Sequence, residues 1–247
     1  MRFVVGSVKA ALFLKDATND RNLSRSYTRI PETPSQVHPM ISFTIQRVTA
    51  ERLSRFGLAC GDDKTMLDHI CIRVGTDKIR FCATNGRLLA SLVVHCDQIQ
   101  GSGDIILDRD QFTTAMKSAS KIVGSVNFMI DVIEARVICR TMSTVIRRID
   151  GKYPNVDHVW SRLTDKKWMP SLCSLDYFLV GLAQKISGVK TPLLFSSPVD
   201  ETGNKPAYWC DHELAFLIMP ITRSDSERQL DFSLHAVSLP QASTLVA

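Results

Sequence analysis

The sequence lacks the long apolar runs and clustered ligand residues that mark membrane-spanning or metal-binding proteins. Lys, Arg, Asp or Glu interrupts every apolar run well before it reaches the length of a bilayer-spanning helix. The apolar stretch 1–14 is not followed by a clean signal-peptidase cleavage site. The seven cysteines form no Cys-x-x-Cys pair and have no histidine at metal-ligand spacing. We therefore expect a cytoplasmic protein with reduced, mostly buried thiols, no metal, no cofactor and no membrane contact.

The common catalytic signatures are also missing. The chain contains no phosphate-binding G-x-x-x-x-G-K-[ST] loop, no G-x-G-x-x-G and no H-E-x-x-H. The adjacent acids Asp62 and Asp63 suit a turn better than a pair of catalytic carboxylates. No cysteine has a neighbour in sequence that would lower its pKa. We predict a protein that is not an enzyme, and an unrecognised Cys/His hydrolase is the less favoured alternative.

The composition provides enough apolar material for a substantial core. Apolar residues make up 45% of the 247 residues, which suffices for one large domain or two ordinary ones. The formal net charge of +5 is compatible with a polyanionic partner. This excess is too small for a protein that grips DNA by charge alone.

A repeated order of one strand, one helix and three strands is the clearest pattern in the chain. In the first copy, a strand at 41–46 leads to a helix capped at Thr49. Its apolar face consists of Leu53, Phe56 and Cys60. The three strands are expected at 70–74, 79–83 and 88–94.

The second copy has the strongest helix signal. After a strand at 104–107, Asp108 is the predicted N-cap, and Gln111 stands three residues later as in a capping box. The predicted apolar face is Phe112, Ala115, Met116, Ala119, Ile122 and Val123. Strands are expected at 126–130, 135–140 and 144–149.

The third copy begins with a short strand at 171–173, and its helix is predicted to be capped at Ser174. The predicted apolar face is Leu175, Phe178, Leu179, Leu182, Ala183 and Ile186. Strands are expected at 193–196, 207–210 and 214–218.

These units predict an α+β fold in which helices cover one face of antiparallel sheets. Because each unit leaves an apolar helix face and an apolar sheet face, units should pair, with sheets continuing across the joins. We expect a complete two-unit domain at 41–160, a half-domain at 161–223 and a C-terminal tail at 224–247. Residues 1–40 contain a candidate strand, a candidate helix and a Pro-containing linker, and are one candidate for part of a fourth unit.

Three separated segments resemble motifs of one known family. Residues 81–90, FCATNGRLLA, resemble the segment ATDGHRLA, with Asn85, Arg87 and Leu88 replacing Asp, His and Arg. Residues 149–159, IDGKYPNVDHV, resemble IDGRFPDYRRV, and residues 214–223, LAFLIMPITR, resemble the ending YVLMPMR. The family is the bacterial DNA polymerase III beta-subunit sliding clamp. The resemblance covers 41–223 and implies a divergent, shortened clamp fold of repeated strand-helix-three-strand units.

In this family the three motifs form one apolar pocket that captures short peptides of polymerases and other clients. The resemblance therefore implies a peptide-binding pocket with Met and branched side chains and with a glycine that admits the peptide backbone. Its residues would be Leu67, Thr84, Gly86, Arg87, Leu89, Pro154, Val159, Leu217, Met219, Pro220 and Ile221. Taken singly, each of these residues also fits an ordinary core or turn position.

The resemblance also implies sequence-independent binding of double-stranded DNA by Lys and Arg on the exposed sides of helices. The candidates are Arg52, Arg55, Lys117, Lys121 and Lys185. A generic solvated helix face remains the alternative for each. Where the family has an Arg-Tyr-Tyr-Leu segment that reaches DNA, this chain has Lys64-Thr-Met-Leu67, so that aromatic contact is absent.

The tail segment Gln229–Leu234, QLDFSL, resembles the peptides that clamps bind. Docking in a neighbouring subunit's pocket and blocking of the chain's own pocket are both open. The alternation of Leu230, Phe232 and Leu234 also fits an extra edge strand, which is the plainer interpretation.

The expected function is that of a DNA processivity factor. Its partners would be double-stranded DNA and, through short peptides, a DNA polymerase, a clamp loader or repair proteins. A homo-oligomeric ring is expected: a chain with four units would close it as a trimer, whereas three units would need another arrangement. A clamp-derived interaction module that does not encircle DNA is the alternative.

Overall fold

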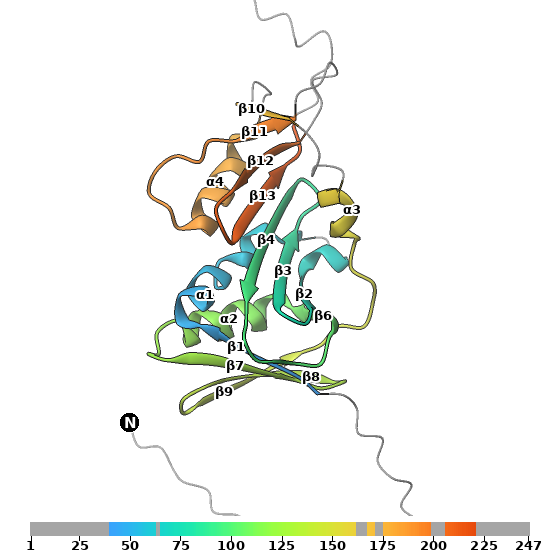
Figure 1. The fold of residues 1–247 in the computed structure, drawn as a ribbon, viewed down its shortest axis with the longest axis vertical. Coiled ribbons are helices and arrows are strands. Elements are labelled where there is room, and N and C mark those ends of the chain that lie inside the picture. The colour runs from blue at the N-terminus through green and yellow to red at the C-terminus, as the bar shows by residue number, and fades with distance from the viewer. Residues whose placement is uncertain (1–39, 63–64, 162–166, 171–174, 199–205, 221–247) are drawn as a thin grey trace, which may run out of the picture. The chain divides into compact units, whose positions relative to one another are not determined.

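The computed structural model describes residues 40–62, 65–161, 167–170, 175–198 and 206–220 of the chain. These residues form two antiparallel sheets with helices packed against them (Figure 1). The predicted 171–173 strand and the elements proposed for 1–39 and for the tail lie outside the described residues. The predicted helix cap at Ser174 is wrong, because the N-cap of that helix is Asp176, whose side chain accepts a hydrogen bond from the Phe178 N–H at 2.9 Å. None of the described helices is long and apolar enough to cross a membrane.

The smaller sheet has five strands in the order β5-β1-β7-β8-β9. Their bounds are β5 Ile99–Gln100, β1 Ile41–Gln46, β7 Ser125–Ile130, β8 Glu134–Cys139 and β9 Met142–Arg147. Along β7, Val126, Phe128 and Ile130 are buried while the residues between them are exposed. This alternation is what a sheet with one solvated face requires.

The larger sheet has eight strands in the order β10-β11-β12-β13-β4-β3-β2-β6. Their bounds are β10 Trp168–Pro170, β11 Ser196–Pro198, β12 Ala207–Cys210, β13 Leu214–Ile218, β4 Leu88–His95, β3 Lys78–Thr84, β2 His69–Val74 and β6 Gly103–Asp108. β13 pairs with β4 in a register that runs from Leu214 opposite Leu92 to Ile218 opposite Leu88. The sheet therefore continues from the third predicted unit into the first.

The first two units exchange their first strands. β1 of the first unit pairs along its whole length with β7 of the second, and β6 of the second unit pairs with β2 of the first. Each sheet is thus completed by a strand from the other unit. Since neither unit closes its own sheet alone, the two form one interlocked body.

The first helix differs from the prediction at its start. α1 (Arg47–Leu53) follows β1 directly, and its N-cap is Gln46, whose side chain makes no capping hydrogen bond. The predicted cap at Thr49 is wrong, because Thr49 lies inside the helix and is buried. The predicted apolar face is divided between two helices: Leu53 lies in α1, and Phe56 lies in the short 3-10 helix η1 (Phe56–Ala59). A second 3-10 helix, η2 (Met66–Asp68), follows.

The second helix, α2 (Arg109–Ala119), begins where the sequence predicts. The Asp108 Oδ1 atom accepts a hydrogen bond from the Gln111 backbone N–H at 3.0 Å. The Gln111 side chain does not complete a capping box, because its Oε1 instead accepts from the Arg147 backbone N–H at 2.7 Å. The predicted face runs too far, since α2 ends at Ala119 and Val123 is exposed.

The third unit contributes α4 (Tyr177–Ser187), which begins at the N-cap Asp176 and ends at Gly188, whose φ is +67°. Leu179, Ala183 and Ile186 are buried at helical spacing, but Phe178 is 61% exposed. Its assignment to the buried face is wrong because it stands one position before that stripe.

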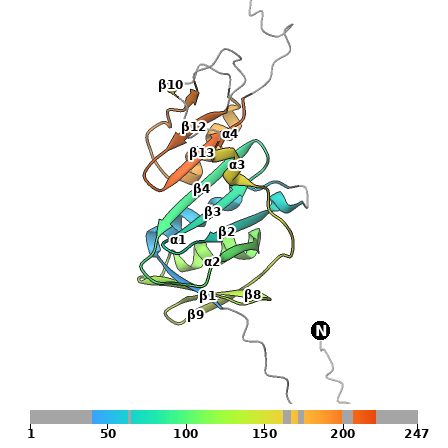
Figure 2. The same cartoon turned by 45° about the vertical axis from the view of Figure 1, so that its right-hand side comes forward.

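Two further elements complete the description. The predicted strand at 193–196 is wrong: β11 starts at Ser196, and the Leu193 backbone N–H donates to the Gln184 side-chain Oε1 at 3.2 Å. A short helix that the sequence did not predict, α3 (Val156–Ser161), follows Pro154. It lies beside the neighbouring ends of β4 and β13 in both views (Figures 1 and 2).

A cluster of four phenylalanines joins the two sheets and α2. Phe43 stacks on Phe128 with ring centroids 4.6 Å apart, and Phe81 lies 6.3 Å from Phe43, Phe112 and Phe128. All four side chains are at most 2% exposed. Aromatic contacts of this kind add to the stabilisation from apolar burial.

We predict that Phe128→Ala lowers the free energy of unfolding by about 3–5 kcal/mol, because it removes a buried ring at the junction of sheets and helix. Val145→Ala is the control, since Val145 is 50% exposed on β9 of the same sheet and should change the value by less than about 0.5 kcal/mol. Urea unfolding measures both. An equal loss of unfolding free energy in both variants would contradict the placement of Phe128 in the core.

Candidate functional site

Three segments that are far apart in sequence meet at one apolar pocket on the eight-stranded sheet. The pocket has a volume of about 320 Å³. We call it the sheet-end pocket, and it is lined by Leu67, Thr84, Gly86, Arg87, Leu88, Leu89, Pro154, Asn155, Val156, Val159, Leu217 and Met219. The three segments are the β3–β4 turn, the chain from Pro154 into α3, and the end of β13; Leu67 of η2 adds a further side chain.

All the predicted pocket residues except Pro220 and Ile221 line this pocket. Ile221 lies outside the described residues. Pro220 does not line this pocket, and its part in a peptide site stays a prediction. Side chains alternate towards the end of β13 and just after it: Leu217 and Met219 line the pocket, while Phe216 and Ile218 belong to the main core.

The structure adds Leu88, Asn155 and Val156 to the lining. Each lies within two positions of a predicted residue in the same motif. Asn155 and Val156 were missed because α3 was not predicted, and α3 turns Val156 and Val159 toward the pocket.

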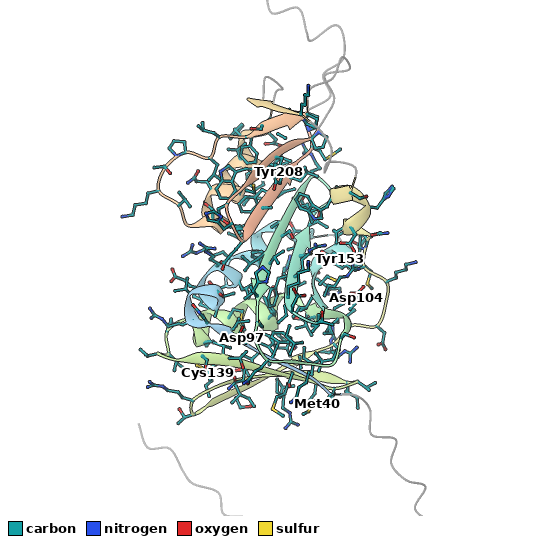
Figure 3. The ribbon with its side chains drawn as sticks, in the orientation of Figure 1. Met40, Asp97, Asp104, Cys139, Tyr153 and Tyr208 are labelled. Carbon is teal, nitrogen blue, oxygen red and sulfur yellow. The ribbon has the colours of Figure 1, made fainter. Side chains whose placement is uncertain are left out.

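A small apolar cluster lies under the pocket, on the face of the sheet opposite α1, α2 and α4. It consists of Cys71, Cys82, Leu89, Ile106, Tyr153, Val156 and Leu217. Tyr153, near α3 in Figure 3, is 9% exposed, and its hydroxyl donates to the His69 carbonyl at 3.4 Å. Burial raises the pKa of Tyr153, so the hydroxyl stays protonated and keeps this donor.

The β3–β4 turn is shaped by its own side chains. The Asn85 Oδ1 atom accepts hydrogen bonds from the backbone N–H groups of Arg87 at 2.9 Å and Leu88 at 2.7 Å, and Thr84 Oγ1 accepts from Gly86 N–H at 3.0 Å. Gly86 has φ +85°, a left-handed conformation that favours glycine. Asn85 thus makes the bonds of a turn-forming aspartate without its charge.

Arg87 connects the turn to two other elements at the pocket rim. Its carbonyl accepts a hydrogen bond from the Met219 N–H at 2.8 Å, which fixes the end of β13 against the turn. Its side chain is 55% exposed, and Nη2 lies 3.2 Å from Oδ2 of Asp176, the N-cap of α4. One exposed guanidinium therefore stands at the mouth of an otherwise apolar pocket.

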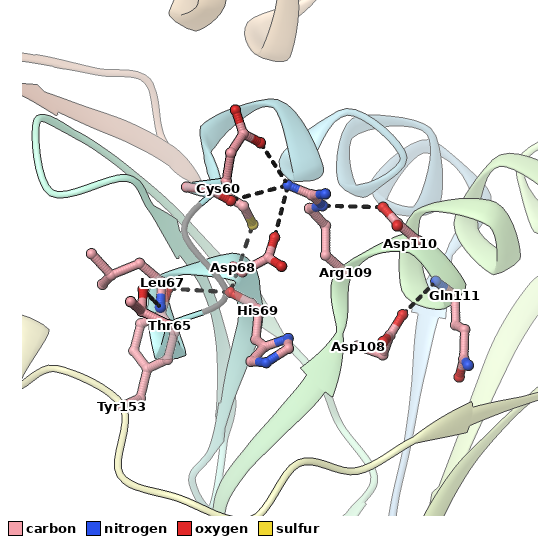
Figure 4. Close-up of polar contacts among 12 residues, drawn as sticks. Cys60, Thr65, Leu67, Asp68, His69, Asp108, Arg109, Asp110, Gln111 and Tyr153 are labelled. Carbon is pink, nitrogen blue, oxygen red and sulfur yellow. Dashed lines mark hydrogen bonds and ion pairs between the residues drawn. The ribbon is translucent and has the colours of Figure 1, made fainter.

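Arg109 on α2 holds the loop that carries Leu67 to the pocket (Figure 4). Its Nη1 atom lies 3.1 Å from the Gly61 carbonyl oxygen and 2.8 Å from Asp68 Oδ1. Gly61 N–H donates to the Leu67 carbonyl at 2.9 Å, and Thr65 Oγ1 accepts from Leu67 N–H at 3.2 Å. Sequence reasoning missed this arginine, because the loop residues that it holds lie more than forty positions earlier in the chain.

The helices that carry the DNA-binding candidates pack on the other face of the eight-stranded sheet (Figure 1). Lys117, Lys121 and Lys185 are exposed, and no ion pair among the described residues involves them. Arg52 instead forms an ion pair with Glu213, with Nη1 2.9 Å from Oε2, and Arg55 pairs with Glu51, with Nη2 2.8 Å from Oε1. The lysines are therefore more available to phosphates than the two arginines.

The buried thiols are poorly suited to nucleophilic chemistry. Burial raises the pKa of Cys60 and Cys71 to about 12 and that of Cys82 to about 11. These thiols stay protonated near neutral pH, and the thiolate is the reactive form. Among the described residues, no group of three or more His, Cys, Asp or Glu side chains is placed to hold a metal ion.

Neither protein-family models nor curated protein sequences give a match to this chain. Solved structures do. A DNA polymerase sliding clamp from Pseudomonas aeruginosa aligns with TM-score 0.59 at 14% identity, over 74% of this chain and 67% of the clamp. A putative DNA polymerase III beta subunit from Eubacterium rectale aligns with a TM-score of 0.56 at 13% identity, over 74% of this chain and 66% of that subunit. The beta subunit from Thermotoga maritima gives 0.54 at 8% identity, over 77% and 67%.

These likenesses show the fold. The chain has the α+β sliding-clamp fold, which confirms the fold class and the resemblance predicted from the three motifs. It spans about two thirds of the length of the clamps it matches.

We predict that Arg109→Ala loosens the loop at Gly61 and Leu67–Asp68, because it removes the cation that binds the Gly61 carbonyl and Asp68. The loss should lower the free energy of local opening by about 1–2 kcal/mol, which speeds amide exchange at Gly61 by about tenfold. Hydrogen–deuterium exchange measures it. Arg136→Ala is the control, since Arg136 is 58% exposed on β8 and pairs only with Glu134 among the described residues. Unchanged exchange in Arg109→Ala would contradict the loop-holding role.

Proposed function

We propose that this protein is a sliding-clamp-like factor that captures short peptides in the sheet-end pocket and tethers their owners to double-stranded DNA. The owners would be DNA polymerases, clamp loaders or repair proteins, and the protein itself would carry out no chemistry. One observation carries the proposal: three motifs, separated by tens of residues, line a single apolar pocket on a clamp fold.

The pocket lining suits an apolar peptide. Leu, Val and Met side chains dominate it, and the thioether of Met219, 43% exposed, can adapt to different guests. The volume of about 320 Å³ is at the lower end of ligand pockets, which fits a few side chains rather than a folded partner. Gly86 leaves room for a peptide backbone, and Arg87 offers a charged group for an acidic residue of the guest.

The proposed DNA contacts use the opposite face of the eight-stranded sheet. The exposed lysines are Lys117 on α2, Lys121 just after α2 and Lys185 on α4. They would attract phosphates without sequence-specific contacts to bases. The sheet then separates a DNA-facing side from a peptide-binding side, so that one molecule can hold both partners at once.

We predict that Met219→Ala weakens binding of a labelled peptide with the sequence Gln-Leu-Asp-Phe-Ser-Leu about tenfold, corresponding to ~1.4 kcal/mol of lost apolar contact. Fluorescence polarisation measures the dissociation constant. Met129→Ala is a matched control, because Met129 is similarly exposed, at 37%, but lies on β7, away from the pocket. Unaltered affinity in Met219→Ala, or an equal loss in both variants, would refute the pocket as the peptide site.

A second candidate function is an interaction module that binds client peptides without encircling DNA. One observation favours it: Arg52 and Arg55, two of the five candidate DNA contacts, already pair with carboxylates.

The clamp proposal predicts topological retention on DNA. An encircling homo-oligomer should co-elute with a nicked circular plasmid and be lost when the plasmid is linearised, because it can slide off the ends. Gel filtration of the two DNA forms measures this, with light scattering to give the oligomeric state. Equal retention on both forms, or a monomer that does not co-elute with either, would favour the interaction module.

A further inference from the structure

The tail segment Gln229–Leu234, whose sequence is that of the probe peptide above, has no assigned role within the intact chain. We propose that this segment occupies the sheet-end pocket of its own chain and competes there with client peptides. The inference rests on the proposed function of the pocket, because it names one particular guest for it. Three features support it: the place where the described chain ends, the length of the connecting segment, and the match in chemistry.

The described chain reaches Pro220 directly after a pocket residue. Met219 lines the pocket, and its N–H is bonded to the Arg87 carbonyl at the rim. The covalent path to the tail segment therefore starts at the pocket itself, so the segment need not travel across the protein to reach it.

The connecting residues 221–228, ITRSDSER, are long enough to fold back. Fully extended, the path from Pro220 to Gln229 spans roughly 30 Å, and as a flexible coil its ends are on average about 17 Å apart. Seven of these eight residues are polar or charged, all but Ile221, which suits a solvated connection. A short tether of this kind produces an effective concentration of about 1 mM.

The segment also matches the pocket in chemistry. In an extended peptide, Leu230, Phe232 and Leu234 share one side and Asp231 lies on the other. The apolar side suits the Leu, Val and Met lining, which would remove these side chains from water. Asp231 would reach the rim, where the 55% exposed Arg87 side chain is available to a second carboxylate besides Asp176.

The consequence is a pocket that is partly self-occupied. A client peptide must displace the tail, so the apparent affinity of the client peptide is lower than its intrinsic affinity. The factor is the effective concentration of the tail divided by the dissociation constant of the tail segment for the pocket. With an effective concentration of about 1 mM and a dissociation constant of about 0.1 mM for the free segment, the reduction is about tenfold.

The experiment measures binding of the labelled Gln-Leu-Asp-Phe-Ser-Leu peptide to full-length chains by fluorescence polarisation. The test variant is Leu230→Ala/Phe232→Ala, which weakens the tail as a competitor. The matched control is Leu239→Ala/Leu245→Ala, which removes two leucines from the same tail outside the segment. Met219→Ala, alone and combined with the test variant, reports whether the peptide binds at the pocket.

We expect the test variant to bind the peptide about tenfold more tightly than the wild type and the control, with the gain reduced when Met219→Ala is added. If wild type, test variant and control bind the peptide with equal affinity while Met219→Ala binds it more weakly, self-occupancy is refuted and the pocket is still supported as the peptide site. This result is expected if the tail segment forms an extra edge strand. No binding to any variant would overturn both. A gain that depends on protein concentration and accompanies dimer dissociation in light scattering would also overturn it, because the tail would then occupy a second copy.

Discussion

The antiparallel pairing of β13 with β4 is the contact on which the candidate site depends. It places Leu217 opposite Leu89 and brings the end of β13 to the β3–β4 turn, where the Met219 N–H bonds to the Arg87 carbonyl. Side chains alternate along a strand, so a slip of one residue would turn Leu217 and Met219 away from the pocket. The register of this one strand pair therefore decides whether the pocket exists.

The core on the helical side of the eight-stranded sheet stabilises that register. The first two units share strands, and the phenylalanine cluster ties both sheets to α2. The eight-stranded sheet therefore has a fixed apolar core on its helical side and a thin cluster with an open pocket on its other side. In the proposed function, the lysines on the helical side contact DNA and the pocket on the other side binds peptides, so that neither site disturbs the other.

Several arginines serve the structure rather than a polyanion. Arg109 holds the Leu67 loop, Arg52 pairs with Glu213 beside β13, and Arg87 pairs with Asp176 at the start of α4. Each joins segments that are distant in sequence. Each of these pairs neutralises one carboxylate as well as one arginine, so the net charge of +5 is unchanged, and the exposed lysines carry most of the proposed attraction to phosphates.

The sequence by itself determined the features that depend on near neighbours. The bounds of β1, β12 and β13 and the Asp108 cap follow from local alternation and capping, and the three motifs contain most of the residues that line the sheet-end pocket. The tertiary structure alone decided the start of α1 after Gln46, the helix α3, the addition of Val156 to the pocket lining and the distant partners of Arg109. These depend on strand register and on contacts between distant segments, whose free energy is set only when the chain has folded and which leave no periodic trace in the sequence.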